Sequence, residues 1–166
     1  MSQYGIRILM LAPSVEIARP LMDGLSQLGC AVQWTSSEED NIAERVTHAQ
    51  MVWVAAEQPQ AAALVKRLTT NFAHALVVVF GTEQESRPWA FEAGAIDYLT
   101  VPLGSAELQA KVQFYQRHLV LQDRYTTQQQ VLQRQDERWR LLLSGTGDGI
   151  FDWNLLTNEV TMTARW

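Results

Sequence analysis

The sequence is poor in residues that build disulfides and metal sites. Its 166 residues include one cysteine, Cys30, and three histidines, His48, His74 and His118, which lie far apart along the chain. A single thiol excludes an internal disulfide and a zinc site made from cysteines. Because the histidines also lack the spacing of metal ligands, we predict no metal site and no bound cofactor.

The chain also lacks an excess of basic residues and any long apolar run. It has 13 lysines and arginines against 18 aspartates and glutamates, a formal net charge of −5, which does not favour a nucleic-acid partner. The apolar run nearest the start, Ile8 to Ala12, is too short for a signal peptide. Nowhere do about 18 apolar residues stand together, as a membrane-spanning helix requires. We therefore expect a cytoplasmic protein with no membrane segment in this stretch.

Short apolar runs and helical patterns alternate over the first hundred residues. The apolar runs lie at residues 6–11, 31–34, 51–55, 75–80 and 95–99. Three of them are nearly continuous and rich in β-branched or aromatic residues, which indicates strands buried on both faces of a parallel sheet. Stretches with helical spacing lie between the runs, at residues 15–28, 38–46, 60–72 and 84–93. The alternation predicts an α/β fold for residues 1–105, a doubly wound parallel sheet of five strands.

A long helix is predicted after this domain, over residues 106–143. Residues 105–143 contain no glycine and no proline, and a helix of that length spans about 55 Å. Large or apolar residues recur along it with alternating spacings of four and three, which is typical of a two-stranded coiled coil. This predicted seam consists of Leu121, Tyr125, Gln128, Leu132, Gln135, Trp139 and Leu142. The alternative is a single solvated helix whose apolar residues have this spacing by chance.

The last segment, residues 144–166, changes character again. Its first residues, 144–149, are rich in glycine and indicate a turn that ends the helix. Residues 150–154 and 160–163 then predict two strands joined by a turn. Two strands alone cannot build a stable core, so we expect this segment to be the start of a further domain.

Two segments resemble known signalling domains. The stretch FEAGAIDYLTVPL at residues 91–103 resembles the end of a two-component receiver domain, where Gly-Ala-x-Asp-Tyr-Leu and Lys-Pro precede the last helix. This resemblance covers about residues 5–118 and implies a flavodoxin-like (βα)5 fold. The stretch from Arg138 to Trp166, with GDGIFDWN at residues 147–154, resembles the opening of a PAS domain. That resemblance covers about 28 residues and implies a partial PAS hairpin.

The reactive groups of a working receiver are missing. By resemblance, such a domain has acids after its first strand that bind Mg²⁺ and an aspartate nucleophile after its third. It also has a hydroxyl after its fourth strand and a lysine before the final proline. This sequence has Ala12 and Pro13, Ala55, Gly81 and Val101 at those positions. A methyl group can neither attack a phosphoryl group nor hold Mg²⁺, so we predict a pseudo-receiver with no catalytic residue.

The combined pattern predicts a non-catalytic regulatory module of a multidomain, bacterial-type signalling protein. The seam predicts a parallel homodimer through the long helix, and the resemblances imply that PAS and output domains follow, such as a histidine kinase or a cyclic-di-GMP enzyme. They also imply a partner surface on the fourth helix, fifth strand and fifth helix, with Tyr98, Phe114 and Tyr115 as candidates, although core packing explains each equally well. A small-molecule sensor that uses the vacated pocket or the PAS module is the alternative, ahead of a working phosphoacceptor.

Overall fold

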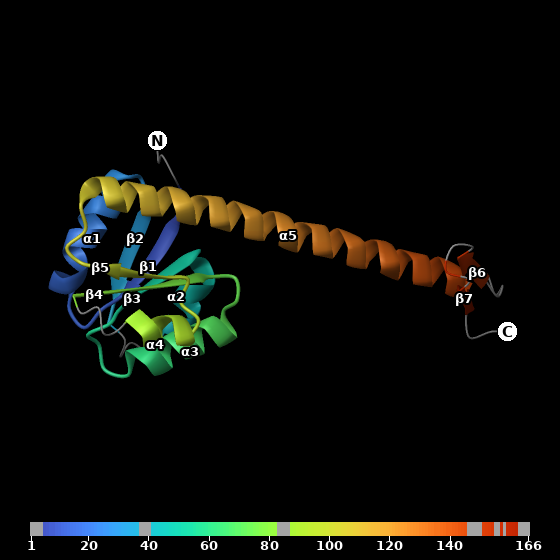
Figure 1. Cartoon of the computed structure of the whole chain (residues 1–166), viewed down its shortest axis with the longest axis horizontal. Helices are drawn as coiled ribbons and strands as arrows, with labels where there is room; N and C mark the ends of the chain where they lie inside the picture. The colour runs from blue at the N-terminus through green and yellow to red at the C-terminus, as the bar shows by residue number, and fades with distance from the viewer. Residues whose placement is uncertain are drawn as a thin grey trace. The chain divides into compact units, whose positions relative to one another are not determined.

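A five-stranded parallel sheet with helices on both faces forms the N-terminal part of the chain (Figure 1). The computed structural model describes residues 5–36, 41–82, 87–145, 151–154, 157 and 159–162. The elements in chain order are β1 (Arg7–Leu11), α1 (Val15–Gln27), β2 (Ala31–Thr35), α2 (Ile42–His48), β3 (Met51–Ala55), α3 (Ala61–Asn71), β4 (Leu76–Gly81), α4 (Arg87–Glu92), β5 (Asp97–Thr100) and α5 (Ser105–Gly145).

The strand order is β2-β1-β3-β4-β5, and every neighbouring pair is parallel. This confirms the predicted doubly wound α/β architecture. Every residue of β3 and β4 is buried, as expected for continuous apolar strands in the middle of a sheet covered on both faces. In β2, at the edge of the sheet, exposed and partly buried residues alternate instead.

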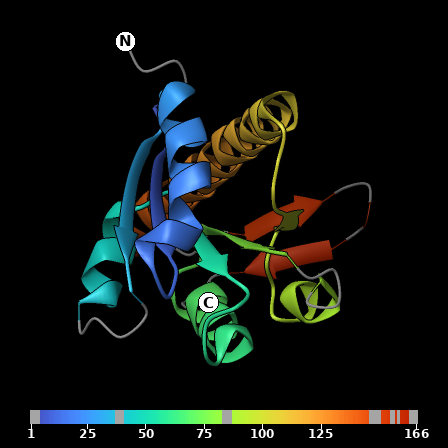
Figure 2. The same ribbon diagram turned by 90° about the vertical axis from the view of Figure 1, so that its left-hand side faces the viewer.

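The two faces of the sheet carry separate apolar clusters. One cluster lies under α1 and the start of α5 and contains Leu25, Trp53 and Tyr115. The other lies under α2, α3 and α4 and contains Val54 and Leu68. Figure 2 shows α1 and α5 on one side of the sheet and the shorter helices on the other. A core on each face explains how about a hundred residues stabilise this domain.

Helix ends agree with the sequence pattern in most places. Helix α1 is followed by Gly29, whose φ of 82° is the left-handed conformation that glycine adopts easily after a helix. The helix expected at residues 38–46 extends from Ile42 to His48, with Asn41 in a turn before it; residues 37–40 lie outside the described part. The expected helix at 84–93 is described from Arg87, because the residues immediately before it also lie outside the described part.

Helix α5 continues without a break from Ser105 to Gly145, which confirms the predicted long helix and extends it two residues past the expected end at Leu143. Its residues from Val120 onward belong to a second compact unit, Val120–Trp166. That unit also contains β6 (Phe151–Asn154) and β7 (Glu159–Met162), which pair antiparallel with Trp153 opposite Val160. The predicted hairpin is therefore present. In the described ranges, no helix is both long and apolar enough to cross a membrane.

Candidate functional site

Four of the five predicted site positions meet at the carboxyl edge of the sheet. Ala12 follows β1, Ala55 ends β3, Gly81 ends β4 and Val101 follows β5. The strand registers place Leu11 opposite Val54, Ala55 opposite Phe80 and Gly81 opposite Thr100. Consecutive members of this set are therefore neighbours. Ligands of open α/β sheets bind at this edge, near the place where strand order reverses. Pro13 follows Ala12 and is exposed.

The side chains at this edge are apolar and closely packed. Ala12 and Ala55 are both 0% exposed, and Val101 packs against the cluster under α1 and α5. The peptide bond from Val101 to Pro102 is cis. A metal ion would need oxygen ligands here, whereas these residues offer methyl groups. Within the ranges that the structure describes, no three His, Cys, Asp or Glu side chains are grouped to hold a metal ion.

Gly81 lies where a side chain has no room. A Cβ atom added to it would lie 2.8 Å from Cβ of Ala56 and 2.8 Å from the hydroxyl oxygen of Tyr98. It would also lie 3.1 Å from Oε1 of Glu57. Real Cβ atoms do not approach other atoms so closely, so a serine or threonine here would force its neighbours to move. The position that resemblance gives to a hydroxyl is thus filled by neighbouring side chains.

Glu57 brings a carboxylate to this edge, two residues after Ala55. Its Oε1 accepts a hydrogen bond of 2.9 Å from the backbone N–H of Thr82 and one of 3.2 Å from the Thr82 hydroxyl. The pair connects the loop after β3 to the loop after β4. The hydrogen bonds between Glu57 and Thr82 therefore hold these two loops together at the edge of the sheet. In sequence, Glu57 lies two residues after Ala55, and Thr82 lies one residue after Gly81.

Gln58 is a polar residue that sequence reasoning missed. Its side chain is 4% exposed, and neither amide atom has a hydrogen-bond partner. Its backbone N–H donates to the carbonyl of Ala55 at 3.4 Å, which places it at the same edge. Leaving buried polar groups unsatisfied costs about 1–3 kcal/mol. A glutamine in a loop is usually exposed, so no sequence signal distinguishes this one.

A cavity of about 380 Å³ lies beside the vacated positions. Thr82 and Val101 line it from the sheet edge, and the remaining lining comes from α1, from the loop after β5 and from the start of α5. Most of these residues are apolar. They are Ile17, Pro20, Leu21, Gly24, Pro102, Leu103, Ser105 and Leu108.

Two of the three aromatic residues predicted for a partner surface are buried in the sheet domain. Tyr98 is 4% exposed and Tyr115 is 0% exposed, whereas Phe114 is 51% exposed. Tyr98 packs in the cluster under α2, α3 and α4, and Tyr115 packs in the cluster under α1 and α5, where it contacts Asp97. Oδ2 of Asp97 accepts hydrogen bonds from the Tyr115 hydroxyl at 2.8 Å and from Nζ of Lys111 at 2.6 Å. Burial, followed by the Asp97 carboxylate, raises the pKa of the Tyr115 phenol.

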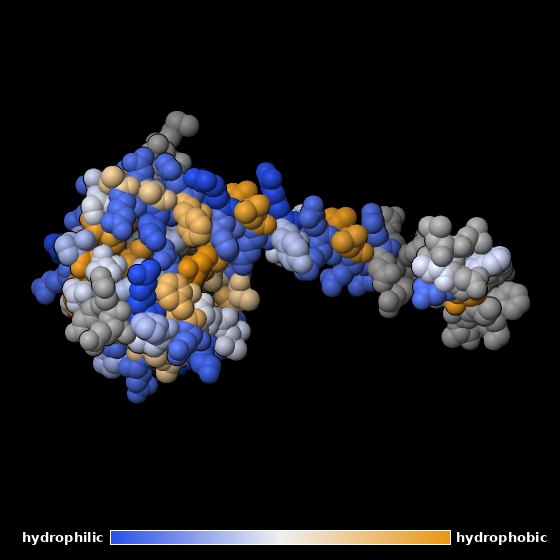
Figure 3. All heavy atoms as spheres, viewed as in Figure 1, coloured by the Kyte–Doolittle hydropathy of each residue, from blue (hydrophilic) through white to orange (hydrophobic). Residues whose placement is uncertain are grey.

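The described residues of the predicted coiled-coil seam are exposed. Leu121, Tyr125 and Leu132 are each about two-thirds exposed, at 64%, 65% and 66%. Gln128 and Gln135 are also exposed. Figure 3 shows apolar residues at intervals on the otherwise polar surface of α5. Trp139 and Leu142 belong to α5, but their side chains lie outside the described part.

Several solved structures with a similar fold are response-regulator receiver domains. No family model matches the sequence, and no curated protein matches it. The BeF3-activated receiver domain of DrrB has a TM-score of 0.56 and 21% identity, covering 67% of this chain and 97% of that one. A receiver domain from Clostridium thermocellum has a TM-score of 0.61 and 17% identity, covering 70% and 98%. An orphan response regulator of H. pylori has a TM-score of 0.53 and 22% identity, covering 70% and 98%. The N-terminal part of this chain therefore has the receiver fold.

Proposed function

We propose that this chain is a regulatory signalling module that uses the receiver fold without accepting a phosphoryl group. The observation that carries the proposal is the pair of buried methyl groups, Ala12 and Ala55, at the edge where a receiver does its chemistry. Covalent phosphoryl transfer needs a nucleophile, and a methyl group is not one. The transfer also needs Mg²⁺ or an equivalent charge to stabilise the phosphoryl oxygens.

The packing at Gly81 supports the same proposal from an independent direction. Because Ala56, Tyr98 and Glu57 occupy the space around it, the hydroxyl of a receiver cannot be restored by one substitution. Val101 adds an apolar side chain where a receiver has a lysine. Four changed positions, each with packing suited to its new residue, favour a domain that works through contacts rather than through chemistry.

The test is incubation of the full chain with acetyl phosphate and Mg²⁺, followed by intact-mass measurement. We expect no phosphoryl adduct, and no change in the amide NMR spectrum with beryllofluoride and Mg²⁺. A receiver domain that retains its aspartate, treated in the same mixture, is the positive control. A stoichiometric adduct on this chain, mapped to any residue of the sheet domain, would reject the proposal.

We also propose that the module acts as a parallel homodimer through α5 and passes signals to PAS and output domains of a longer protein. Exposed Leu121, Tyr125 and Leu132 support the pairing, because isolated helices rarely keep such residues in water. The antiparallel pair β6 and β7 supports the PAS interpretation, since it agrees with the hairpin expected there. Parallel pairing would hold two copies of the next domain side by side, so that a shift at the sheet domain reaches both.

A small-molecule sensor is the second candidate, favoured by the 380 Å³ cavity and by Gln58 at the same edge. The cavity has the size of a small-ligand site, and its lining is mostly apolar. Cyclohexanol, which combines an apolar body with one hydroxyl, should shift the methyl NMR signals of Ile17, Leu21 and Leu108. If those signals do not move at the highest soluble concentration, this candidate is removed and the first one stands.

A further inference from the structure

In the described part of the chain, the apolar cluster on the face that carries α2 does not extend to the edge strand β2. Helix α2 has 7 residues and is about 10 Å long, whereas the 5 residues of β2 extend about 17 Å. Ile42 and Val46 attach α2 to a cluster that includes Leu9 and Val52 of β1 and β3. Among the described residues, that cluster contains none from β2. A short helix that packs over β1 and β3 cannot also shield β2.

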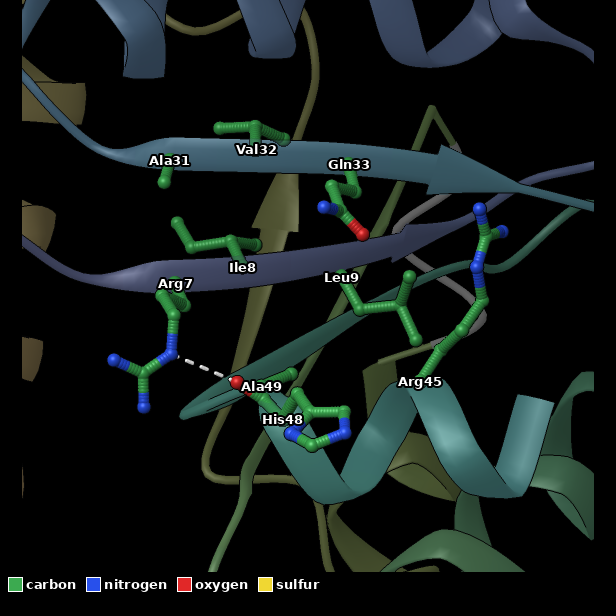
Figure 4. A pocket seen from close by; sticks show the side chains of 9 residues that line it. All are labelled: Arg7, Ile8, Leu9, Ala31, Val32, Gln33, Arg45, His48 and Ala49. Atoms are coloured by element: carbon green, nitrogen blue, oxygen red, sulfur yellow. Dashed lines mark hydrogen bonds between the residues drawn. The ribbon is translucent and has the colours of Figure 1, made fainter. Parts of the chain in front are cut away.

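The result is a hollow of about 250 Å³ between β1, β2 and α2 (Figure 4). Side chains alternate across a sheet, so Ala31 and Gln33 of β2 face α2, while Val32 and Trp34 pack with the opposite cluster. Buried Leu9 and Ala49, together with Ala31, give the hollow an apolar floor. Arg7 and Ala31 begin their strands, so the hollow lies toward the amino ends of β1 and β2, away from the vacated edge.

The rim of this hollow is basic. Arg7, Arg45 and His48 line it, and among the residues that the structure describes no aspartate or glutamate does. The local excess contrasts with the whole chain, whose net charge is −5. Figure 4 shows Arg7 at one end of the hollow and Arg45 at the other, with Gln33 of β2 and His48 of α2 between them. Nε of Arg7 donates a hydrogen bond of 2.8 Å to the carbonyl of His48, which fixes that guanidinium and uses one of its five N–H groups.

We propose that this hollow binds a small organic anion, a carboxylate or a phosphate monoester with a compact apolar body. Guanidinium groups present paired N–H donors that match the oxygens of both anions. The floor of Leu9, Ala31 and Ala49 would cover the apolar body, which an inorganic ion lacks. The amide of Gln33 can donate to a further oxygen. This site is independent of the proposed signalling function, because it shares no residue with the vacated edge.

The first experiment titrates the full chain with benzoate, phenyl phosphate, inorganic phosphate and neutral benzyl alcohol, observed by amide NMR. We expect saturable shifts in β1, β2 and α2 with benzoate or phenyl phosphate, at a Kd on the order of 1 mM. Whichever of the two binds more tightly identifies the headgroup. Inorganic phosphate and benzyl alcohol should each bind at least about tenfold more weakly, because phosphate lacks the apolar body and benzyl alcohol lacks the negative charge. Equal binding of benzyl alcohol, or no saturable shift with either anion, would overturn the proposal.

Substitutions at the rim provide the second experiment. Arg45→Gln combined with His48→Gln should raise the Kd of the better anion at least about tenfold, because two basic side chains are removed. Gln33→Glu places a negative charge, which repels the anion, at an exposed position of β2. It should also raise the Kd at least about tenfold, without disturbing the core. The matched control is Arg19→Gln, at an exposed position of α1 on the opposite face of the sheet. It should change the Kd less than about twofold. If Arg19→Gln weakens binding as much as the rim variants, general charge attraction is the cause and the site is rejected.

Discussion

The two parts of α5 use their apolar residues differently. From Ser105 to Leu119 the helix buries Leu108, Val112 and Tyr115 against the sheet, with spacings of four and three. From Val120 onward its described apolar residues, among them Leu121 and Leu132, are about half exposed or more. Both parts form one continuous helix with similar composition. Helical structure alone therefore does not show which apolar side chains are buried within the chain and which are left exposed for contact with another chain.

A second stripe on the first part of α5 makes the comparison more informative. Phe114 and His118 are exposed, and their rings lie 6.2 Å apart between centroids. Their spacing continues at Leu121 and Tyr125, with steps of four, three and four. The exposed stripe thus begins inside the sheet domain and reaches the predicted seam without a change of register. Because Tyr98 and Tyr115 are buried, Phe114 is the residue of that aromatic set that a second copy can contact.

The largest expected effect comes from breaking the seam in the second part. Leu121→Glu together with Leu132→Glu would place like charges opposite each other in a parallel pair and convert the dimer to a monomer. Light scattering at tens of micromolar should show the mass fall by about half, while the melting temperature of the sheet domain stays unchanged.

The matched control for that prediction is Gln130→Glu with Gln133→Glu. It adds the same charge to the same helix outside the seam, at exposed positions, and should leave the mass unchanged. A wild-type monomer, or a dimer that tolerates the leucine substitutions, would reject the coiled coil and leave α5 as a single solvated helix.

The next effect concerns the attachment of the first part to the sheet. Asp97→Ala removes the acceptor shared by Tyr115 and Lys111 and should lower the free energy of unfolding by about 2–4 kcal/mol. Urea denaturation measures the loss, and exposed Asp23→Ala should change the value by less than about 0.5 kcal/mol. The dimer mass should not change. A variant as stable as the wild type would mean that Leu108 and Val112 hold the helix without the polar contacts.

A smaller effect is expected where the exposed stripe begins. Phe114→Ala should raise the dimer dissociation constant about tenfold, the equivalent of about 1.4 kcal/mol, because a half-exposed ring is removed from the pairing surface. Sedimentation equilibrium measures the change. The control is Phe91→Ala, which removes an exposed phenylalanine from α4 instead of α5. Equal weakening by both would indicate a contact face that includes α4 rather than a stripe confined to α5.

The strands were predictable because their apolar patterns are local. All five sheet strands begin and end within about two residues of the expected runs, and β3 is matched over its full length. That Ala12 and Ala55 lie at the same edge of the sheet was predictable for a similar reason. In a parallel sheet, residues just after neighbouring strands must meet at one edge.

The contacts that decide exposure were not predictable. Asp97 and Tyr115 are 18 residues apart and meet only when α5 docks beside β5. Glu57 and Thr82 are 25 residues apart and require two loops to converge. The hollow beside β2 depends on how far a short helix reaches, which periodicity does not specify. Aromatic residues such as Tyr98 fit either a core or a surface, and only the surrounding packing distinguishes the two.

The smallest expected effect compares one buried and one exposed tyrosine on the same helix. Because burial and then Asp97 raise the pKa of the Tyr115 phenol, the folded chain keeps this proton after the unfolded chain releases it near pH 10. The folded state then binds more protons, so stability present below about pH 10 is lost as the pH rises further. Tyr115→Phe should lower the free energy of unfolding by about 1 kcal/mol at pH 8, through the lost hydrogen bond to Asp97, and by much less at about pH 11. Tyr125→Phe removes a tyrosine that is 65% exposed, on the second part of the helix, and is the control substitution. Urea denaturation at the two pH values measures the difference. If Tyr115→Phe lowers the free energy of unfolding equally at both, ionisation of the Tyr115 phenol does not contribute to the pH dependence of stability.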